Sequence, residues 1–193
     1  STPLTPQQEE TVNAIAGHYR EIIKLLGENP DREGLLKTPN ALREPFSGLH
    51  AGMTNQAEVI EKAVFTHEGS RMVIVKDIEF YSFCEHHILP FFGHVSIGYI
   101  PDGKIVGLSK LARLVNVYAR RLQVQERMTA RYAAISSGIL PQGRHRGQHR
   151  AAPVHEAPGV EKQDSATTTT ETSGVFDDDY RLREEFYRAL DHN

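Results

Sequence analysis

The sequence contains a single cysteine, Cys84, among its 193 residues. One cysteine excludes a disulfide within the chain and is typical of proteins from a reducing compartment, so we predict a cytoplasmic location. No apolar run approaches the roughly 20 residues of a membrane span, and residues 1–6 lack the basic and apolar regions of a signal peptide. The net charge of -3 provides no basic field for nucleic acid. Neither a membrane nor a nucleic-acid partner is therefore predicted.

The remaining composition, 39% hydrophobic and 24% charged, is ordinary for a globular protein that buries a core. Thr5-Pro6 is typical of a helix start, and apolar residues then recur at helical spacing until Gly27. Thr38-Pro39 predicts a second short helix, and a third, weaker one is expected at residues 56–62. We predict a helical extension over residues 1–50 and one larger domain over residues 51–193.

From residue 71 the period changes to that of strands. Residues 71–83 and 93–100 are rich in β-branched and aromatic side chains and predict an antiparallel hairpin, followed by a turn at Pro101-Asp102-Gly103. Two helices are expected next, one capped by Ser109 and one over residues 124–137. Residues 165–170 read as a further strand, and a closing helix follows Asp177-Asp178-Asp179. The pattern predicts an α+β fold.

The stretch Ser82 to Pro90 raises the main functional question. Cys84 precedes His87 by three residues at the predicted end of a strand, a spacing at which a thiolate and an imidazole can hold one Zn²⁺. The alternative is a buried cysteine beside surface histidines. Lys110 and Arg113 on the helix after Ser109 leave a similar choice between a binding surface and a solvated basic face.

Several motifs together resemble the GTP cyclohydrolase I family. They are Cys84-Glu85-His86-His87, the run from Gly107 to Arg113, the run from Arg121 to Arg127, the run from Asp31 to Pro39, and the run from Ser165 to Thr170. The resemblance implies the tunnelling fold, with helices packed on one side of antiparallel sheets, in a homodecamer with active sites between subunits. It also implies a zinc enzyme that opens the imidazole ring of GTP, releases formate and forms 7,8-dihydroneopterin triphosphate, the first step towards folate or a pterin cofactor.

The resemblance also implies roles for individual residues. Cys84 and His87 match the first two zinc ligands, and His86 matches a catalytic histidine that moves protons. Glu126, with Gln125 beside it, would accept the two hydrogen-bond donors on the Watson–Crick edge of guanine. The triphosphate would be held at a helix N-terminus by three residues: Ser109, Lys110 and Arg113.

Residues 144–158 depart from the family pattern. Aligned on Gly159-Val160, the second catalytic histidine falls on Ala152, the third zinc ligand on Val154 and a phosphate-binding arginine on Pro158. These side chains cannot perform those roles. The segment has no strand pattern, which would leave a sheet edge unpaired. His155 stands next to the ligand position, but a shift of one residue on a strand points it to the opposite face.

A reading-frame slip confined to this segment would explain the departure. Read one nucleotide later with free third bases, residues 144–147 can encode Val-Thr-Val-Val, and Ala152, Val154 and Pro158 can become His, Cys and Arg. Two other functions remain open. One is a non-catalytic, zinc-poor member that assembles and binds GTP or a partner subunit. The other is an enzyme of the same fold with a cysteine nucleophile, which the tandem His86-His87 disfavours.

Overall fold

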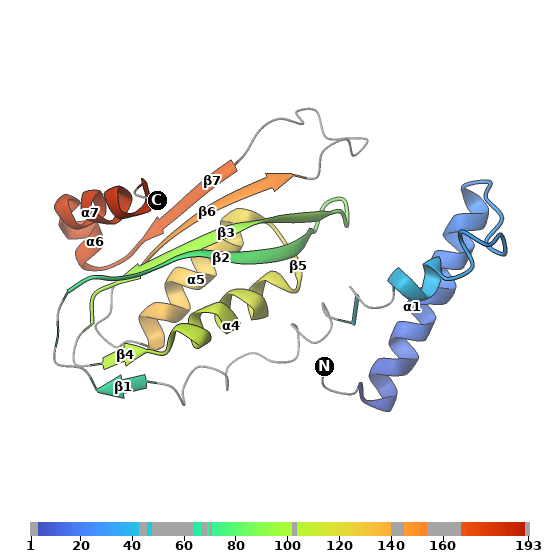
Figure 1. The fold of residues 1–193 in the computed structure, drawn as a ribbon, viewed down its shortest axis with the longest axis horizontal. Coiled ribbons are helices and arrows are strands. Elements are labelled where there is room, and N and C mark those ends of the chain that lie inside the picture. Colours follow the sequence, from blue (N-terminus) through green and yellow to red (C-terminus); the bar gives the residue numbers. More distant parts are fainter. Residues whose placement is uncertain are drawn as a thin grey trace. The chain divides into compact units, whose positions relative to one another are not determined.

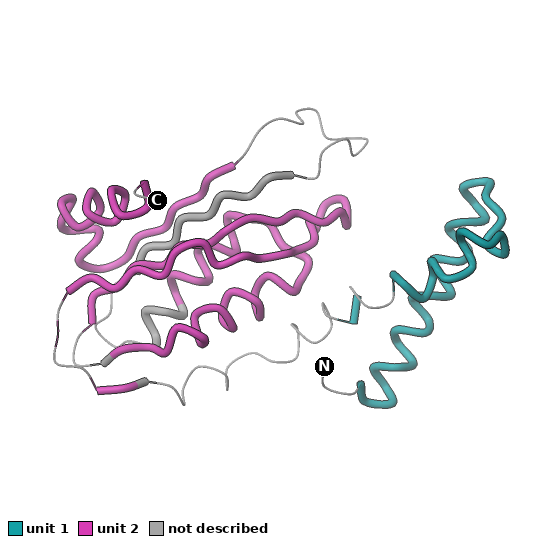
Figure 2. Tube along the Cα trace, viewed as in Figure 1, with its two compact units in different colours: residues 1–54 teal, residues 55–193 magenta. Residues whose placement is uncertain are grey.

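The computed structural model describes residues 4–42, 46–47, 64–66, 69, 71–101, 104–139, 145–153 and 167–191. At residues 64, 104, 135–139 and 145–153 it describes the backbone alone. The chain divides into two compact units, residues 1–54 and residues 55–193, which Figure 2 distinguishes by colour.

The first unit is built on helix α1 (Pro6–Leu25), and the predicted helix start is confirmed. The Thr5 hydroxyl accepts a hydrogen bond from the Gln8 backbone amide, while the Gln8 side chain accepts one from the Thr5 amide. This reciprocal pair satisfies two amides that no helical carbonyl reaches. The helix buries Val12, Ala16 and Ile23. Gly27 follows the C-cap with φ of 85°, a conformation that glycine adopts without steric cost.

The segment after α1 is held to it by a charge pair, because Arg20 of the helix contacts Asp31 at 2.5 Å. Within the segment, Arg32 contacts Glu28 at 2.9 Å. Residues 38–42 and 46–47 are helical, in agreement with the helix predicted from Thr38-Pro39. The weaker helix predicted over residues 56–62 lies outside the described residues.

The second unit contains a five-stranded sheet in the order β5-β2-β3-β6-β7 (Figure 1). Its strands are β2 (Val73–Cys84), β3 (Pro90–Tyr99), β5 (Leu122–Gln123), β6 (His145–Pro153) and β7 (Thr167–Thr172). All neighbours are antiparallel except β5, which runs parallel to the end of β2. The short strands β1 (Val64–Thr66) and β4 (Lys104–Val106) pair separately. The predicted α+β class is confirmed.

The predicted hairpin is the pair β2 and β3, whose register runs from Val73 opposite Tyr99 to Phe83 opposite Pro90. The register shifts between Val75 and Ile78, where Asp77 adopts a φ of 56°. There the Asp77 amide donates a hydrogen bond to the Ser96 hydroxyl at 3.2 Å instead of to the ladder. The bulge bends β2 along its length. Of the predicted turn after β3, only Pro101 lies among the described residues.

The core lies between one face of this sheet and the helices α4 (Leu108–Ala119) and α5 (Gln125–Ile139). Alternating β3 residues supply the sheet side, and α4 supplies an apolar stripe at helical spacing. Tyr132 links the two helices, since its hydroxyl donates to the Val115 carbonyl at 2.9 Å, and burial raises the pKa of this phenol far above its usual value. The buried cluster consists of Phe80, Val95, Ile97, Tyr99, Val106, Leu111, Leu114, Val115, Tyr118, Ala119, Met128 and Tyr132.

The chain closes with α6 (Val175–Asp178) and α7 (Tyr180–Asp191), where one helix was expected. The helices are divided at Asp179, whose extended backbone ends α6 and whose carboxylate accepts a hydrogen bond from the Arg181 amide at 2.9 Å. Phe186 of α7 is fully buried and its ring lies against Gly98. Because Gly98 alternates with the core residues of β3, α7 covers part of the sheet face opposite α4 and α5.

Three further expectations from the sequence need correction. The N-cap of α4 is Gly107, and Ser109 is the second residue of the helix. Helix α5 continues through Gly138 to Ile139. Residues 145–153 form strand β6, although their side chains carry no strand pattern, and β6 pairs along its length with β3 and β7. The predicted unpaired edge is therefore wrong, because two neighbouring ladders fix the backbone of β6.

No helix in the described part of the chain is long and apolar enough to cross a membrane.

Candidate functional site

Cys84 is the last residue of β2 and begins the tight loop that leads to β3. Its amide donates to the Leu89 carbonyl at 2.8 Å, and its carbonyl accepts from the Ile88 amide at 2.9 Å. Ile88 has a φ of 55°, a strained conformation for a β-branched residue. These bonds close the loop and bring the three side chains of the predicted site, Cys84, His86 and His87, to one place.

The Cys84 thiol faces both histidines. Its Sγ lies 3.7 Å from Nδ1 of His87 and 3.8 Å from Nδ1 of His86. A sulfur and a nitrogen that bind one tetrahedral zinc are about 3.5 Å apart, given Zn–S of about 2.3 Å and Zn–N of about 2.0–2.1 Å. The thiol and either imidazole therefore fit two positions of a zinc site, and distance alone does not separate His86 from His87.

The described residues contain no group of three metal-binding side chains placed to hold an ion. Val154, the position aligned with the third ligand, and its neighbour His155 lie outside those residues. Ala152, aligned with the second catalytic histidine, lies on β6 in register with Phe92 of β3. An alanine at that position supplies neither a ligand nor a proton donor.

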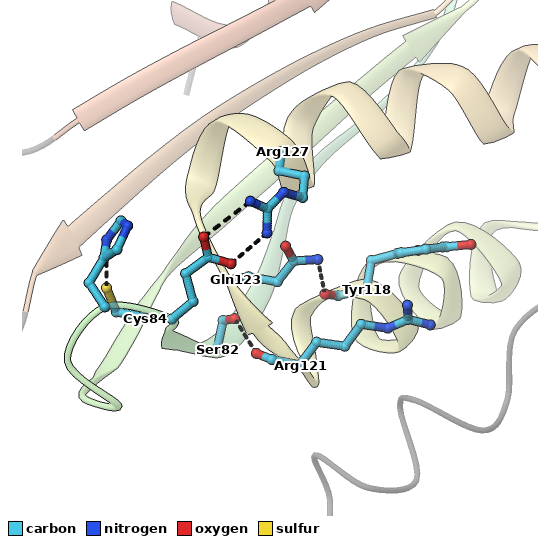
Figure 3. A network of polar contacts seen from close by, with 8 residues as sticks. Ser82, Cys84, Tyr118, Arg121, Gln123 and Arg127 are labelled. Atoms are coloured by element: carbon cyan, nitrogen blue, oxygen red, sulfur yellow. Dashed lines mark hydrogen bonds and ion pairs between the residues drawn. The ribbon is translucent and has the colours of Figure 1, made fainter.

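The Cys84 loop is attached to the connection between α4 and α5 (Figure 3). Phe83 and Cys84 pair in parallel with Leu122 and Gln123 of β5. Next to this pairing, the buried hydroxyl of Ser82 donates to the Arg121 carbonyl at 3.3 Å. The buried amide of Gln123 in turn donates to the Tyr118 carbonyl at 3.1 Å. These bonds place the start of α5 beside the loop.

Glu85 forms a second attachment. Its amide donates to the Gln123 carbonyl at 3.0 Å, and its carboxylate accepts hydrogen bonds from both terminal nitrogens of Arg127, at 2.5 and 3.1 Å (Figure 3). These hydrogen bonds, together with the guanidinium charge, lower the pKa of the Glu85 carboxyl from its usual value. The carboxylate is therefore charged at neutral pH, and the two-bond pair fixes the relative orientation of loop and helix.

The two residues predicted to read guanine start helix α5. Gln125 is buried, and its amide nitrogen donates to the Thr167 carbonyl at 2.8 Å and to the Thr169 hydroxyl at 3.2 Å. This nitrogen is thus engaged with β7. Glu126 is exposed in the first turn of α5, one residue before Arg127. Of the pair, Glu126 is the side chain presented to solvent.

Ser109, Lys110 and Arg113 occupy the first two turns of α4. Ser109 and Arg113 are exposed, and Lys110 is partly buried. The opposite end of this helix approaches the Cys84 loop, because Arg121 lies just beyond it and contacts Ser82. A helix of this length spans about 18 Å, and Figure 1 shows it running from β4 to β5. One chain therefore does not bring the predicted phosphate-binding residues to its own Cys84 loop.

Sequence reasoning missed the links that hold the site together. Glu85 and Arg127 both stand within motifs that were singled out, yet neither was assigned a role, and 42 residues separate them. Their opposite charges were the available signal. Ser82 and Gln123 gave no signal, because their partners are backbone carbonyls.

Residues 15–191 match the family model of GTP cyclohydrolase I. GTP cyclohydrolase 1 of Campylobacter jejuni subsp. doylei is 43% identical over 180 residues, which cover 89% of this chain and 91% of that protein. GTP cyclohydrolase 1 of Porphyromonas gingivalis is 45% identical over 189 residues, covering 95% and 96%. Among solved structures, the archaeosine synthase QueF-Like in the apo form gives a TM-score of 0.46 at 17% identity, covering 55% of this chain and 97% of that one.

The structural likeness is too weak to assign a fold, whereas the two sequence findings agree with each other. Each of the two relatives exceeds 40% identity over almost its whole length. The match to the family extends from the middle of α1 to the end of α7 and includes the Cys84 loop and the start of α5. The chain belongs to the GTP cyclohydrolase I family.

Proposed function

We propose that this protein is a zinc-dependent hydrolase that converts GTP to 7,8-dihydroneopterin triphosphate and formate. One observation carries the proposal beyond family membership. The Cys84 thiol lies within 3.8 Å of both His86 and His87, in a loop that is bonded to the start of α5, where Glu126 is exposed. A thiol, imidazoles and a carboxylate are the groups that this chemistry needs.

Cys84 and His87 would hold the zinc, in keeping with the separation of their sulfur and nitrogen atoms. A bound zinc ion would lower the pKa of a water molecule and so supply a hydroxide-like nucleophile at neutral pH. His86 lies next to this pair and would donate and accept protons as the imidazole ring of GTP opens. The loop bonds at Cys84 and Ile88 hold the two imidazoles on the same side of the strand end.

Glu126 would select guanine, because a carboxylate accepts hydrogen bonds from both N1–H and the 2-amino group. Adenine lacks this pair of donors. The triphosphate would be held by Ser109, Lys110 and Arg113 near the start of α4, where the positive end of the helix dipole and cationic side chains favour an anion. Since these residues lie at the remote end of α4 from the Cys84 loop, they would serve the site of a second copy of the chain.

The same proposal includes the tunnelling fold, a homodecamer and a cytoplasmic location, and it places the reaction at the start of folate or pterin-cofactor synthesis. A site shared between copies would require an oligomer. The α+β architecture, with α4 and α5 on one face of the antiparallel strands, supports the tunnelling fold.

A second candidate is a non-catalytic, zinc-poor member that assembles and binds GTP or a partner subunit. The observation that favours it is Ala152, which stands in β6 where the family resemblance expects a histidine. A reading-frame slip over residues 144–158 would remove this objection. A peptide mass spectrum of the purified protein over these residues decides the matter, because the written and shifted readings have different masses.

The deciding experiment incubates the purified protein with GTP and measures pterin fluorescence after oxidation, together with released formate and zinc per subunit. The proposed enzyme yields both products in equal amounts with about one zinc per subunit, and loses activity on chelation. A metal-free protein that binds GTP without forming a pterin would instead establish the second candidate.

A further inference from the structure

We propose that Glu85 and Arg127 act as paired positioning residues that hold the Cys84 loop at a fixed geometry against the start of α5. The inference rests on the proposed function, since it concerns how the groups assigned there are held relative to one another. In this proposal neither Glu85 nor Arg127 contacts the substrate or the metal.

Glu85 is held to the segment 123–127 at two points. Its amide donates to the Gln123 carbonyl at 3.0 Å, next to the parallel pairing of Cys84 with Gln123. Its carboxylate is bound by both terminal nitrogens of Arg127. The backbone bond attaches the loop to β5, and the ion pair attaches it at a second point, in the first turn of α5, so that the Glu85 side chain and the loop that carries it are held against the helix.

Each residue of the pair is adjacent in sequence to a residue with a proposed function. Cys84 directly precedes Glu85, and Glu126 directly precedes Arg127. Successive side chains on a strand end or a helix point in different directions. Glu85 and Arg127 can therefore face each other while the Cys84 thiol faces His86 and His87. The ion pair thus joins the backbone that carries the thiol to the backbone that carries the proposed guanine-reading carboxylate.

The location of the pair favours a geometric role over a general stabilising one. The side chain of Arg127 is 47% exposed and that of Glu85 is 29% exposed. Ion pairs in such surroundings add little to global stability because solvent screens them. A planar guanidinium with two parallel bonds does, however, fix orientation, which a lysine ammonium cannot do.

The test uses the full-length protein and the variants Glu85→Gln, Arg127→Gln, Arg127→Lys and the double variant Glu85→Gln/Arg127→Gln. Arg131→Gln is the matched control, since it removes the same charge from an exposed position one turn further along α5. Hydrogen exchange by mass spectrometry follows a peptide over residues 83–89, which contains the amides of Glu85 and Ile88. Steady-state kinetics with GTP and thermal unfolding are measured on the same samples.

Arg127→Gln is expected to speed exchange in that peptide about tenfold and to lower kcat about tenfold with KM within about twofold, because substrate still binds but reacts in fewer geometries. Arg127→Lys should recover only part of the loss. The double variant should be no worse than either single variant, since a broken pair cannot be broken again. Arg131→Gln should match the wild type, and unfolding temperatures should change little.

Three results would overturn the proposal. Unchanged exchange over residues 83–89 in Arg127→Gln would show that the pair does not hold the loop. A raised KM with unchanged kcat would make Arg127 a substrate contact. Multiplying losses in the double variant would show that the two residues act separately. If the wild type forms no pterin, the proposed function fails, and the exchange measurements alone still decide whether this pair positions the loop.

Discussion

Gly98 on β3 lies directly beneath the ring of Phe186 on α7: a Cβ atom at position 98 would come within 2.5 Å of Cδ2 and 2.7 Å of Cε2. The ring is completely buried, so it has little room to move away. We therefore expect Gly98→Ala to lower the free energy of unfolding by about 1–3 kcal/mol through overpacking. Denaturant unfolding followed by circular dichroism measures this change.

Gly17→Ala is the control for the effect of the substitution itself. Gly17 lies inside α1, and apart from the backbone of that helix no heavy atom of the described residues would lie within 4 Å of an added Cβ. Alanine has the higher helix propensity, so this variant should be more stable than the wild type by up to about 1 kcal/mol. Equal stability of Gly98→Ala and the wild type would mean that α7 does not pack on β3 as described.

The stability of α7 should depend on pH through Asp179. The Asp179 carboxylate accepts hydrogen bonds from the backbone amide and the side chain of Arg181, and these bonds, the backbone one foremost, lower the pKa of Asp179. Because the pKa is lower in the folded state, the stabilisation is complete above the unfolded value of about 4 and disappears as pH falls through the folded value. Thermal unfolding of the wild type and of Asp179→Asn should therefore differ at pH 7 and converge in acid.

Asp179→Ala distinguishes the charge from the hydrogen bond. Asparagine caps a helix almost as well as aspartate, so Asp179→Asn mainly removes the favourable charge at the N-terminus of α7. Alanine removes the acceptor altogether, and its deficit should persist in acid. Convergence of all three proteins at low pH would argue against a capping role for this residue.

Local signals account for the parts of the fold that the sequence predicted correctly. The capping box of Thr5 and Gln8, the turn at Gly27 and the alternation of Val95, Ile97 and Tyr99 depend on neighbours within a few residues. The start of α4 was misplaced from Gly107 to Ser109 because a serine favours caps, although here it makes no capping bond. Strand β6 was missed because it is defined by the pairing of its backbone with β3 and β7. Its own side chains form no pattern that predicts a strand.

In the candidate site, too, the contacts within one loop could be predicted from the sequence, whereas the contacts between distant segments could not. The contact between Cys84 and His87 follows from a three-residue spacing in a tight loop, so sequence could predict it. The bond between Glu85 and Arg127 requires β5 to lie parallel to β2, which brings residues 42 positions apart together. Such a contact depends on the complete sheet order. The remoteness of Lys110 from Cys84 likewise appears only once α4 is placed along the sheet.

The proposed role of Glu126 predicts a change in base selectivity. Inosine triphosphate lacks the 2-amino group of GTP, so the wild type should prefer GTP in kcat/KM by about 10- to 100-fold, the effect of one hydrogen bond to a charged acceptor. Glu126→Gln should lose most of this preference, because an amide has one acceptor oxygen and presents a donor in place of the other. Competition assays with both nucleotides measure the ratio. An unchanged ratio in Glu126→Gln would place the guanine reader elsewhere.

The placement of the phosphate-binding residues predicts that two inactive variants restore each other. Cys84→Ala removes the thiol from one side of a shared site, and Lys110→Ala removes a cation from the other side, which belongs to a neighbouring copy. If the copies mix at random, one site in four receives both intact halves, so co-expressed variants should recover about a quarter of the wild-type activity. Pterin formation by the co-purified mixture, with each variant assayed alone, measures the recovery. A mixture as inactive as its components would mean that each site is built from a single chain, which would require Lys110 to reach the Cys84 loop of its own subunit across the length of α4.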